Sequence, residues 1–367
     1  MNAPYLPLSY QSSKSVLQYL SAALRFEFSN RCPGIRSTDN STPLRIRNFR
    51  INFISLNVDN VRYRVGVIRH YHNGNTEQCK KENSAGGAKH DIDEYGLFAN
   101  TEPFEQCPDE IIFLNYQAVT DLQEMHDVDE RTGRNTLTEL MNDSNPDNEK
   151  IQELEELLTL HQLQRERSVP PFSCYIQLQI LSGVHRKKVK SVERVEYKQS
   201  VYNAMKYLVW KFLAGRTTIF TQHFGFFCQD PIRVPREMRV HTKNLHFKTG
   251  ILDMFQQLQP FLTADSFPLE SFKTDGWGID FNDSIIRNSK VLFLRNTDED
   301  LDLRSVKHSN IRVLDNAESE DDFLALLRHW LENVPSVGTS FSINTSRRDN
   351  RMNQTINMKV QEIRRLD

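Results

Sequence analysis

The chain has 367 residues, which is more than one ordinary hydrophobic core and predicts two or three domains. Hydrophobic residues make up 38% of it and include 22 Phe, which argues against global disorder. The 46 basic and 48 acidic residues leave a net charge of −2, which gives no electrostatic basis for whole-protein binding to nucleic acid or to an anionic membrane.

The cysteine pattern indicates a reducing compartment. Their number is odd and no two form a CxxC pair, so we expect reduced thiols in the cytoplasm or nucleus rather than a disulfide framework. The first 16 residues lack a charged segment followed by an apolar run, so no signal peptide is expected. The most apolar later stretch, around Tyr207–Ala214, is interrupted by Lys211 and is too short to span a bilayer. We therefore expect no membrane association.

The first 44 residues predict a helical hairpin. Ser12 or Ser13 can cap a first helix that carries Val16, Leu17 and Leu20 on one face. Each helix of the hairpin is only two or three turns long, so it must dock on something, because isolated helices shorter than about 12–15 residues are marginal in water.

The second helix of this hairpin begins at Ser21 and is expected to end at Pro33-Gly34. It places Leu24, Phe28 and Cys32 at spacings of four, which predicts one apolar face.

The apolar pattern of this hairpin resembles an F-box. The positions that carry the resemblance are Leu6-Pro7, Leu17, Tyr19-Leu20, Leu24, Phe28, Cys32 and Ile35-Arg36. The resemblance implies a partner protein, the adaptor subunit of a cullin-type ubiquitin ligase. The partner-binding residues that follow from it are Leu6, Pro7, Val16, Leu17, Leu20 and Leu24. The alternative is a hairpin that only caps the core, because short apolar patterns are not specific.

A wider resemblance covers nearly the whole chain except its tail. The N-terminal segment, then DIDEYG at Asp91–Gly96, then PPFSCYIQLQI at Pro170–Ile180 follow one another in that order. In this order they resemble a nematode-expanded family of uncharacterised proteins, whose members continue into a region similar to F-box-associated homology domains. The resemblance implies an architecture but no established activity.

Residues 45–198 predict an antiparallel, β-rich domain. Apolar residues two apart flank Val58-Asp59-Asn60 and predict a hairpin from Phe49 to Val67. Alternation resumes in Phe172–Leu181 and Val189–Tyr197, which predict a second hairpin. Arginines lie among the apolar residues of the first hairpin. Arginine beside aromatic residues can stack on bases, but a solvated outer face of the sheet is the favoured explanation, because one-sided burial produces this alternation without any ligand.

Three polar segments interrupt this domain. Residues 73–90 predict a loop, and Asp91–Gly96 predicts a turn rather than a calcium site, because it departs from the EF-hand pattern. A zinc site from the nearby histidines and Cys79 is not expected, because the spacings match no standard module. Residues 116–169 predict an acidic helical insertion. Its helix, Asn148–Arg167, is expected to be amphipathic, with an apolar face of Ile151, Leu154, Leu158 and His161.

Residues 199–340 predict a helix followed by β/α repeats. The helix, Gln199–Leu213, places Val201, Met205, Leu208 and Phe212 on one face. Strand-like segments then recur every 20 to 25 residues with helix candidates between them, which resembles a short leucine-rich repeat. The strand segments are Asn244–Lys248, Leu269–Thr274, Val291–Asn296 and Ile311–Asn316. A final helix is expected at Ser319–Asn333, and residues 341–367 are a polar tail.

Together these patterns predict an α+β protein with an N-terminal helical hairpin, an antiparallel β-rich middle and short leucine-rich-repeat-like β/α repeats. None of the frames GxSxG, HExxH, GxxxxGK[ST] or GxGxxG occurs, so we predict no catalytic residue, metal or cofactor and no enzymatic activity. The expected function is that of a non-enzymatic protein-interaction module. The most specific form of this hypothesis is a substrate-recognition adaptor of a cullin-type ubiquitin ligase. The alternatives are a structural scaffold without a ligase link and a weak nucleic-acid binder that uses the arginine-rich hairpin.

Overall fold

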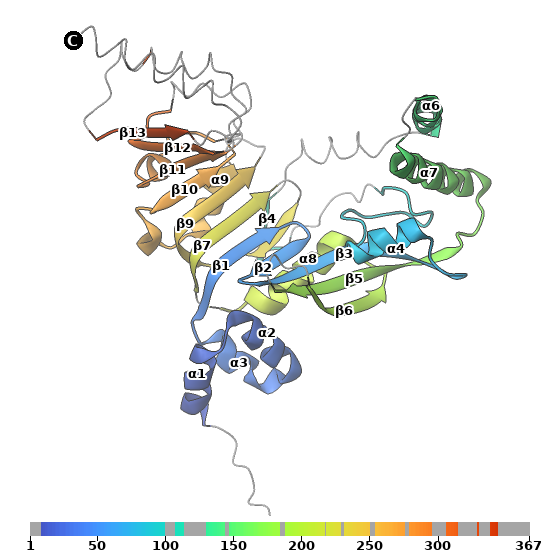
Figure 1. Ribbon diagram of the computed structural model, residues 1–367. Coiled ribbons are helices and arrows are strands. Elements are labelled where there is room, and N and C mark those ends of the chain that lie inside the picture. Colours follow the sequence, from blue (N-terminus) through green and yellow to red (C-terminus); the bar gives the residue numbers. More distant parts are fainter. Residues whose placement is uncertain are drawn as a thin grey trace, which may run out of the picture. The chain divides into compact units, whose positions relative to one another are not determined.

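The computed structural model describes residues 9–99, 107–113, 130–143, 147–183, 188–216, 218–228, 231–249, 254–275, 279–295, 306–314, 329 and 338–343. The chain contains both helices and strands, in part as separate runs, which confirms the predicted α+β class (Figure 1). The chain divides into two compact units. The first comprises Met1–Ile219 and Cys228–Met238, and the second comprises Phe220–Phe227 and Arg239–Asp367.

The first unit begins with the predicted helical hairpin. Its helices are α1 (Tyr10–Tyr19), α2 (Ala22–Arg31), the 3₁₀ turn η1 (Pro33–Ile35) and α3 (Arg36–Asn40). Ser9, and not Ser12 or Ser13, caps α1, because the Ser9 hydroxyl accepts a hydrogen bond from the Ser12 amide. Ser21 caps α2 in the same way, as predicted.

Five strands of the first unit form an antiparallel run in the order β1-β2-β3-β5-β6. Their bounds are β1 (Leu44–Asn52), β2 (Ser55–Val58), β3 (Val61–Tyr71), β5 (Phe172–Ser182) and β6 (Lys188–Glu196). The hairpin predicted around Val58-Asp59-Asn60 joins β2 to β3. A further turn after Asn52 was not predicted. The Asn52 carboxamide oxygen accepts hydrogen bonds from the amides of Ile54 and Ser55 and reverses the chain there.

One face of these strands is apolar and packs against α8 (Val201–Leu213). The ring of Tyr63 on β3 lies 4.9 Å from that of Phe212, and the ring of Phe26 stacks on Phe212 at 4.4 Å. The predicted apolar face of α8 is confirmed, because Val201, Met205, Leu208 and Phe212 are all buried.

The segment after β3 contains a helix, α4 (Glu77–Ser84), so the prediction of a loop over residues 73–90 was wrong. Thr76 caps this helix, because its hydroxyl accepts a hydrogen bond from the amide of Cys79. The side chain of Cys79 is fully buried and anchors the otherwise polar segment. The Asn83 carboxamide donates to the Arg69 carbonyl at 2.7 Å and fixes the end of α4 against β3.

The close approach of this segment to β3 requires a glycine. A Cβ atom on Gly66 would lie 2.2 Å from the carbonyl oxygen of Gly86, which is a backbone atom and cannot rotate away. We expect Gly66→Ala to lower the free energy of unfolding by about 1–3 kcal/mol, as overpacking does, when measured by urea titration. Gly34→Ala is the control, because nothing lies within 4 Å of a Cβ there. Equal stabilities of the two variants would contradict the expectation.

The acidic insertion contains two helices that pack on each other, α6 (Glu130–Met141) and α7 (Asn148–Glu166). The buried contact of α7 is made by Leu160, which packs with Leu97 and Phe172. The prediction did not include Leu160, and the four residues of the predicted face are half-buried: Ile151, Leu154, Leu158 and His161.

A small antiparallel sheet pairs β4 (Glu110–Phe113) with β8 (Ile232–Pro235). Its first residue, Glu110, is fully buried and is surrounded by donors. The Arg233 guanidinium donates to both carboxylate oxygens, at 2.6 and 2.9 Å, and Lys206 lies 3.0 Å away. This sheet was not predicted, because each strand is only four residues long.

The second unit is a sheet in the order β13-β12-β11-β10-β9-β7. Its elements are β7 (Ile219–Cys228), β9 (Val240–Thr249), α9 (Met254–Leu258), η3 (Gln259–Phe261), η4 (Ala264–Ser266), β10 (Ser271–Thr274), α10 (Ser284–Arg287), β11 (Leu292–Arg295), β12 (Asn310–Leu314) and β13 (Ser340–Ile343).

The pairs from β9 to β13 are parallel, and β9 to β12 overlap the strand segments predicted from the sequence. Leu245, Phe272, Leu292 and Ile311 align across four strands and are all buried. The likeness to a leucine-rich repeat stays a prediction, and the final helix and most of the tail lie outside the described residues.

Candidate functional site

The predicted partner-binding residues occupy different environments on the N-terminal helices. Leu6 and Pro7 lie outside the described residues. Leu17 is buried, with 1% of its surface exposed, and contributes to the core. Leu20, at the end of α1, is half-buried. These positions therefore divide between core and surface.

The outer sides of α1 and α2 carry large apolar side chains in solvent. Val16 is 45% exposed and Tyr19, one turn further along α1, is 90% exposed. Leu24 and Phe28, one turn apart on α2, are 51% and 40% exposed. Residues three or four apart lie on one side of a helix, so each helix presents a pair. We call Val16, Tyr19, Leu24 and Phe28 the apolar helix surface.

The predicted apolar face of α2 lies in solvent. Leu24, Phe28 and Cys32, the predicted apolar face, are exposed. The buried side instead carries Arg25 and Phe26, together with Ala22 and Ser29. A buried arginine is not expected from hydrophobic periodicity, because burial of a charge requires a partner that the pattern does not reveal.

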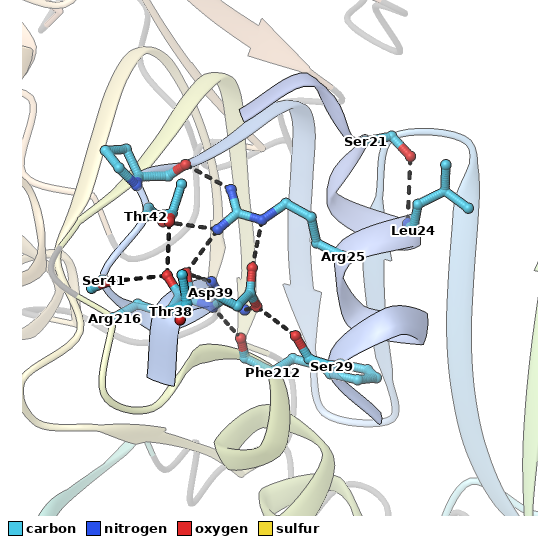
Figure 2. Close-up of polar contacts among 11 residues, drawn as sticks. Ser21, Leu24, Arg25, Ser29, Thr38, Asp39, Ser41, Thr42, Phe212 and Arg216 are labelled. Carbon is cyan, nitrogen blue, oxygen red and sulfur yellow. Dashed lines mark hydrogen bonds and ion pairs between the residues drawn. The ribbon is translucent and has the colours of Figure 1, made fainter. Parts of the chain in front are cut away.

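The partner of Arg25 is the fully buried carboxylate of Asp39 in α3 (Figure 2). The Arg25 Nε atom donates to one Asp39 oxygen at 2.6 Å. The other oxygen accepts from Arg216, which follows α8, at 2.5 Å, and from the Ser29 hydroxyl at 2.9 Å. The carboxylate thus joins α2, α3 and the end of α8.

Backbone carbonyls accept further hydrogen bonds from the two guanidinium groups. Arg25 donates to the carbonyls of Asp39, Thr42 and Pro43 at 2.7–2.8 Å. Arg216 donates to the Phe212 carbonyl at 2.6 Å. Burial alone would raise the pKa of the Asp39 carboxyl, but the charges and hydrogen bonds of Arg216 and Arg25 outweigh it and hold that pKa below its usual range.

A cavity beside this network has a volume of about 10 Å³ and is lined by residues that include Ser29, Asp39, Phe212 and Arg216. That volume has room for about one water molecule, so it does not admit a metabolite. The arrangement therefore fixes α2 and α3 on the rest of the first unit, while the apolar helix surface lies in solvent.

The acidic segment considered from the sequence is structural. Asp91–Gly96 forms a turn, as predicted, because the Asp93 carboxylate accepts from the amides of Tyr95 and Leu97. Asp91 is buried and accepts from the Tyr197 hydroxyl at 2.7 Å. Within the described ranges no three His, Cys, Asp or Glu side chains gather as a metal site would require. None of the helices in that part of the chain has the length and apolarity that crossing a membrane requires.

Comparison with known proteins finds a family match in the C-terminal part of the chain. No curated protein and no solved structure matches the chain significantly. Residues 200–347 match the family described as "Domain of unknown function (DUF3557)". The match begins at Ser200, the cap of α8, and extends past β13, so it excludes the N-terminal helices and the strands β1 to β6. The chain therefore contains a domain of unknown function, which agrees with the predicted relation to an uncharacterised family.

Proposed function

We propose that the protein is a non-enzymatic protein-interaction module whose N-terminal helices dock on a partner protein. The observation that carries the proposal is the apolar helix surface, with Tyr19 90% exposed and Leu24 51% exposed. By contrast, the 13-residue helix α8 has one strongly exposed large apolar side chain, Tyr207. Grouped exposed apolar side chains are typical of interaction sites, and each of the helices α1 and α2 carries such a pair.

The partner class comes from the resemblance of the hairpin to an F-box, which implies the adaptor subunit of a cullin-type ubiquitin ligase. In this proposal the rest of the chain recognises a substrate, and the protein works in the cytoplasm or nucleus. The buried Asp39 network supports the proposal physically. It holds α2 in one position, so that docking does not require ordering the helix first.

Binding of the full chain to the purified adaptor subunit tests the proposal by titration calorimetry. We expect a dissociation constant in the micromolar range or below for the wild-type chain. The double variant Leu24→Ser and Phe28→Ser should weaken binding about tenfold or more, because truncation of a central apolar contact costs about 1–2 kcal/mol.

The matched control is Val189→Ser and Val192→Ser. These two valines are similarly exposed, at 46% and 43%, but lie on β6. An equal loss of affinity in both double variants would contradict docking through α1 and α2. The absence of binding at micromolar adaptor concentrations would remove the ligase link and leave a scaffold that binds a different protein.

A further inference from the structure

The antiparallel strands of the first unit place three arginines on one face. Arg62 and Arg64 lie two residues apart on β3 and so point to the same side. Arg64 is opposite Gln179 of β5, and Gln177, two residues before it, is opposite Arg194 of β6. Residues opposite each other in a sheet share a face, so Arg194 joins the other two. We call Arg62, Arg64 and Arg194 the arginine face.

The protein gives these three guanidinium groups only neutral acceptors. Arg62 Nε donates to the Asn57 carboxamide oxygen at 2.8 Å, and Arg194 Nε donates to that of Gln177 at 3.0 Å. Arg64 Nε is buried and has no acceptor. Within the described part of the chain, no carboxylate pairs with any of the three.

Elsewhere in the first unit, buried guanidinium groups are matched by carboxylates. Arg25 and Arg216 share Asp39, Arg233 binds Glu110, and Arg69 on the same strand β3 pairs with acidic residues of α4 and α7. Removing a charge from water without a counter-charge is unfavourable, which explains these pairs. Arg64 departs from the rule within this fold.

The backbone around Arg64 makes room for its guanidinium group. Gly86 follows α4 at φ +110°, and a Cβ atom on it would lie 2.7 Å from Cζ and Nε of Arg64. The nearby carbonyls of Asn83 and Ser84 accept from Gln177 and Gln179, so neutral amides use them. Burial, and then the charge of Arg62, lower the pKa of Arg64, which agrees with a cation that lacks a counter-charge.

We infer that the arginine face binds a phosphate monoester dianion, either free in solution or carried on a phosphorylated side chain. Guanidinium groups bind phosphate oxygens in pairs of parallel hydrogen bonds, and the terminal nitrogens of these arginines are the donors for them. Two negative charges match the adjacent cations Arg62 and Arg64, whereas one carboxylate would neutralise only one. This inference is independent of docking through α1 and α2.

The test measures the thermal unfolding midpoint of the full chain against inorganic phosphate at constant ionic strength, with acetate in parallel. A ligand that binds the folded state raises the midpoint with concentration. We expect phosphate, and not acetate, to do so for the wild-type chain. Arg64→Met and Arg194→Met should each raise the dissociation constant for phosphate at least tenfold. The control is Arg31→Met, an exposed arginine on α2.

Arg194 is exposed, so its variant is expected to fold even if Arg64→Met does not. An equal midpoint rise in Arg194→Met and wild type, or no rise with phosphate, overturns the inference. A single-stranded oligonucleotide that binds when phosphate does not would also overturn it. A phosphoserine peptide that binds at least tenfold more tightly than inorganic phosphate, while its unmodified form does not bind, identifies a protein-borne source. Equal affinities identify a free phosphate ester.

Discussion

Asp39→Ala should lower the free energy of unfolding by about 3–5 kcal/mol, measured by urea titration at pH 7. The substitution leaves the side chains of Arg25 and Arg216, which are 2% and 3% exposed, buried without their shared carboxylate. A loss of this size is a large part of the roughly 5–15 kcal/mol that stabilises a typical protein. We also expect α2 to lose its fixed position, so adaptor binding should weaken together with stability.

The control for this prediction is Glu27→Gln. Glu27 lies on the same helix, and its half-buried carboxylate pairs with the exposed side chains of Arg31 and Lys190. Exposed ion pairs contribute between 0 and about 1 kcal/mol, so this variant should unfold close to the wild type. If Asp39→Ala were no less stable than Glu27→Gln, the network would not be what holds α2 and α3 in place.

Glu110→Gln should destabilise the protein at pH 7 by about 3 kcal/mol, and the difference should vanish in acid. Burial would raise the pKa of Glu110, but hydrogen bonds from Arg233, the Cys107 amide and Lys206 lower it to about 2. A group whose pKa is depressed by folding stabilises the protein above its unfolded pKa and loses that contribution as the pH falls through its folded pKa. The stabilities of wild type and variant should therefore converge between about pH 4.5 and about pH 2.

Urea titrations at several pH values measure this convergence. Glu196→Gln is the matched control, because Glu196 is exposed and pairs with Lys198 at the surface. Its stability should follow that of the wild type across the whole range. Parallel pH profiles for Glu110→Gln and wild type would show that the carboxylate of Glu110 is not the titrating group.

The sequence was sufficient for the elements in which periodicity and burial agree. Alternation predicted β5 and β6, and spacing of three and four residues predicted the buried side of α8, including Met205 and Phe212. In α8 the apolar side chains face the core and nothing competes with them. In β6 the alternation predicted the strand, although its valines are exposed.

The sequence did not show which side of a helix is buried where that depends on an ion pair. On α2 the apolar stripe through Leu24 and Phe28 is exposed, because the opposite side carries Arg25, whose partner Asp39 lies 14 residues away. Periodicity contains no information about such a pair. The same limit applies to the candidate site. The spacing predicted an apolar stripe on α2, but its exposure to solvent depends on the ion pair that buries the opposite side of the helix.

The sequence separation within this ion network determines when the network can form during synthesis. The ion pair between Asp39 and Arg216 joins residues 177 positions apart. Translation adds about 5–20 residues per second, so Asp39 waits roughly 10–35 s for Arg216 to be synthesised. The carboxylate of Asp39 is therefore synthesised well before the residue that joins it to the end of α8. A nascent chain that stops before Arg216 can form the pair between Arg25 and Asp39, but it lacks the second cation, which joins α3 to the end of α8.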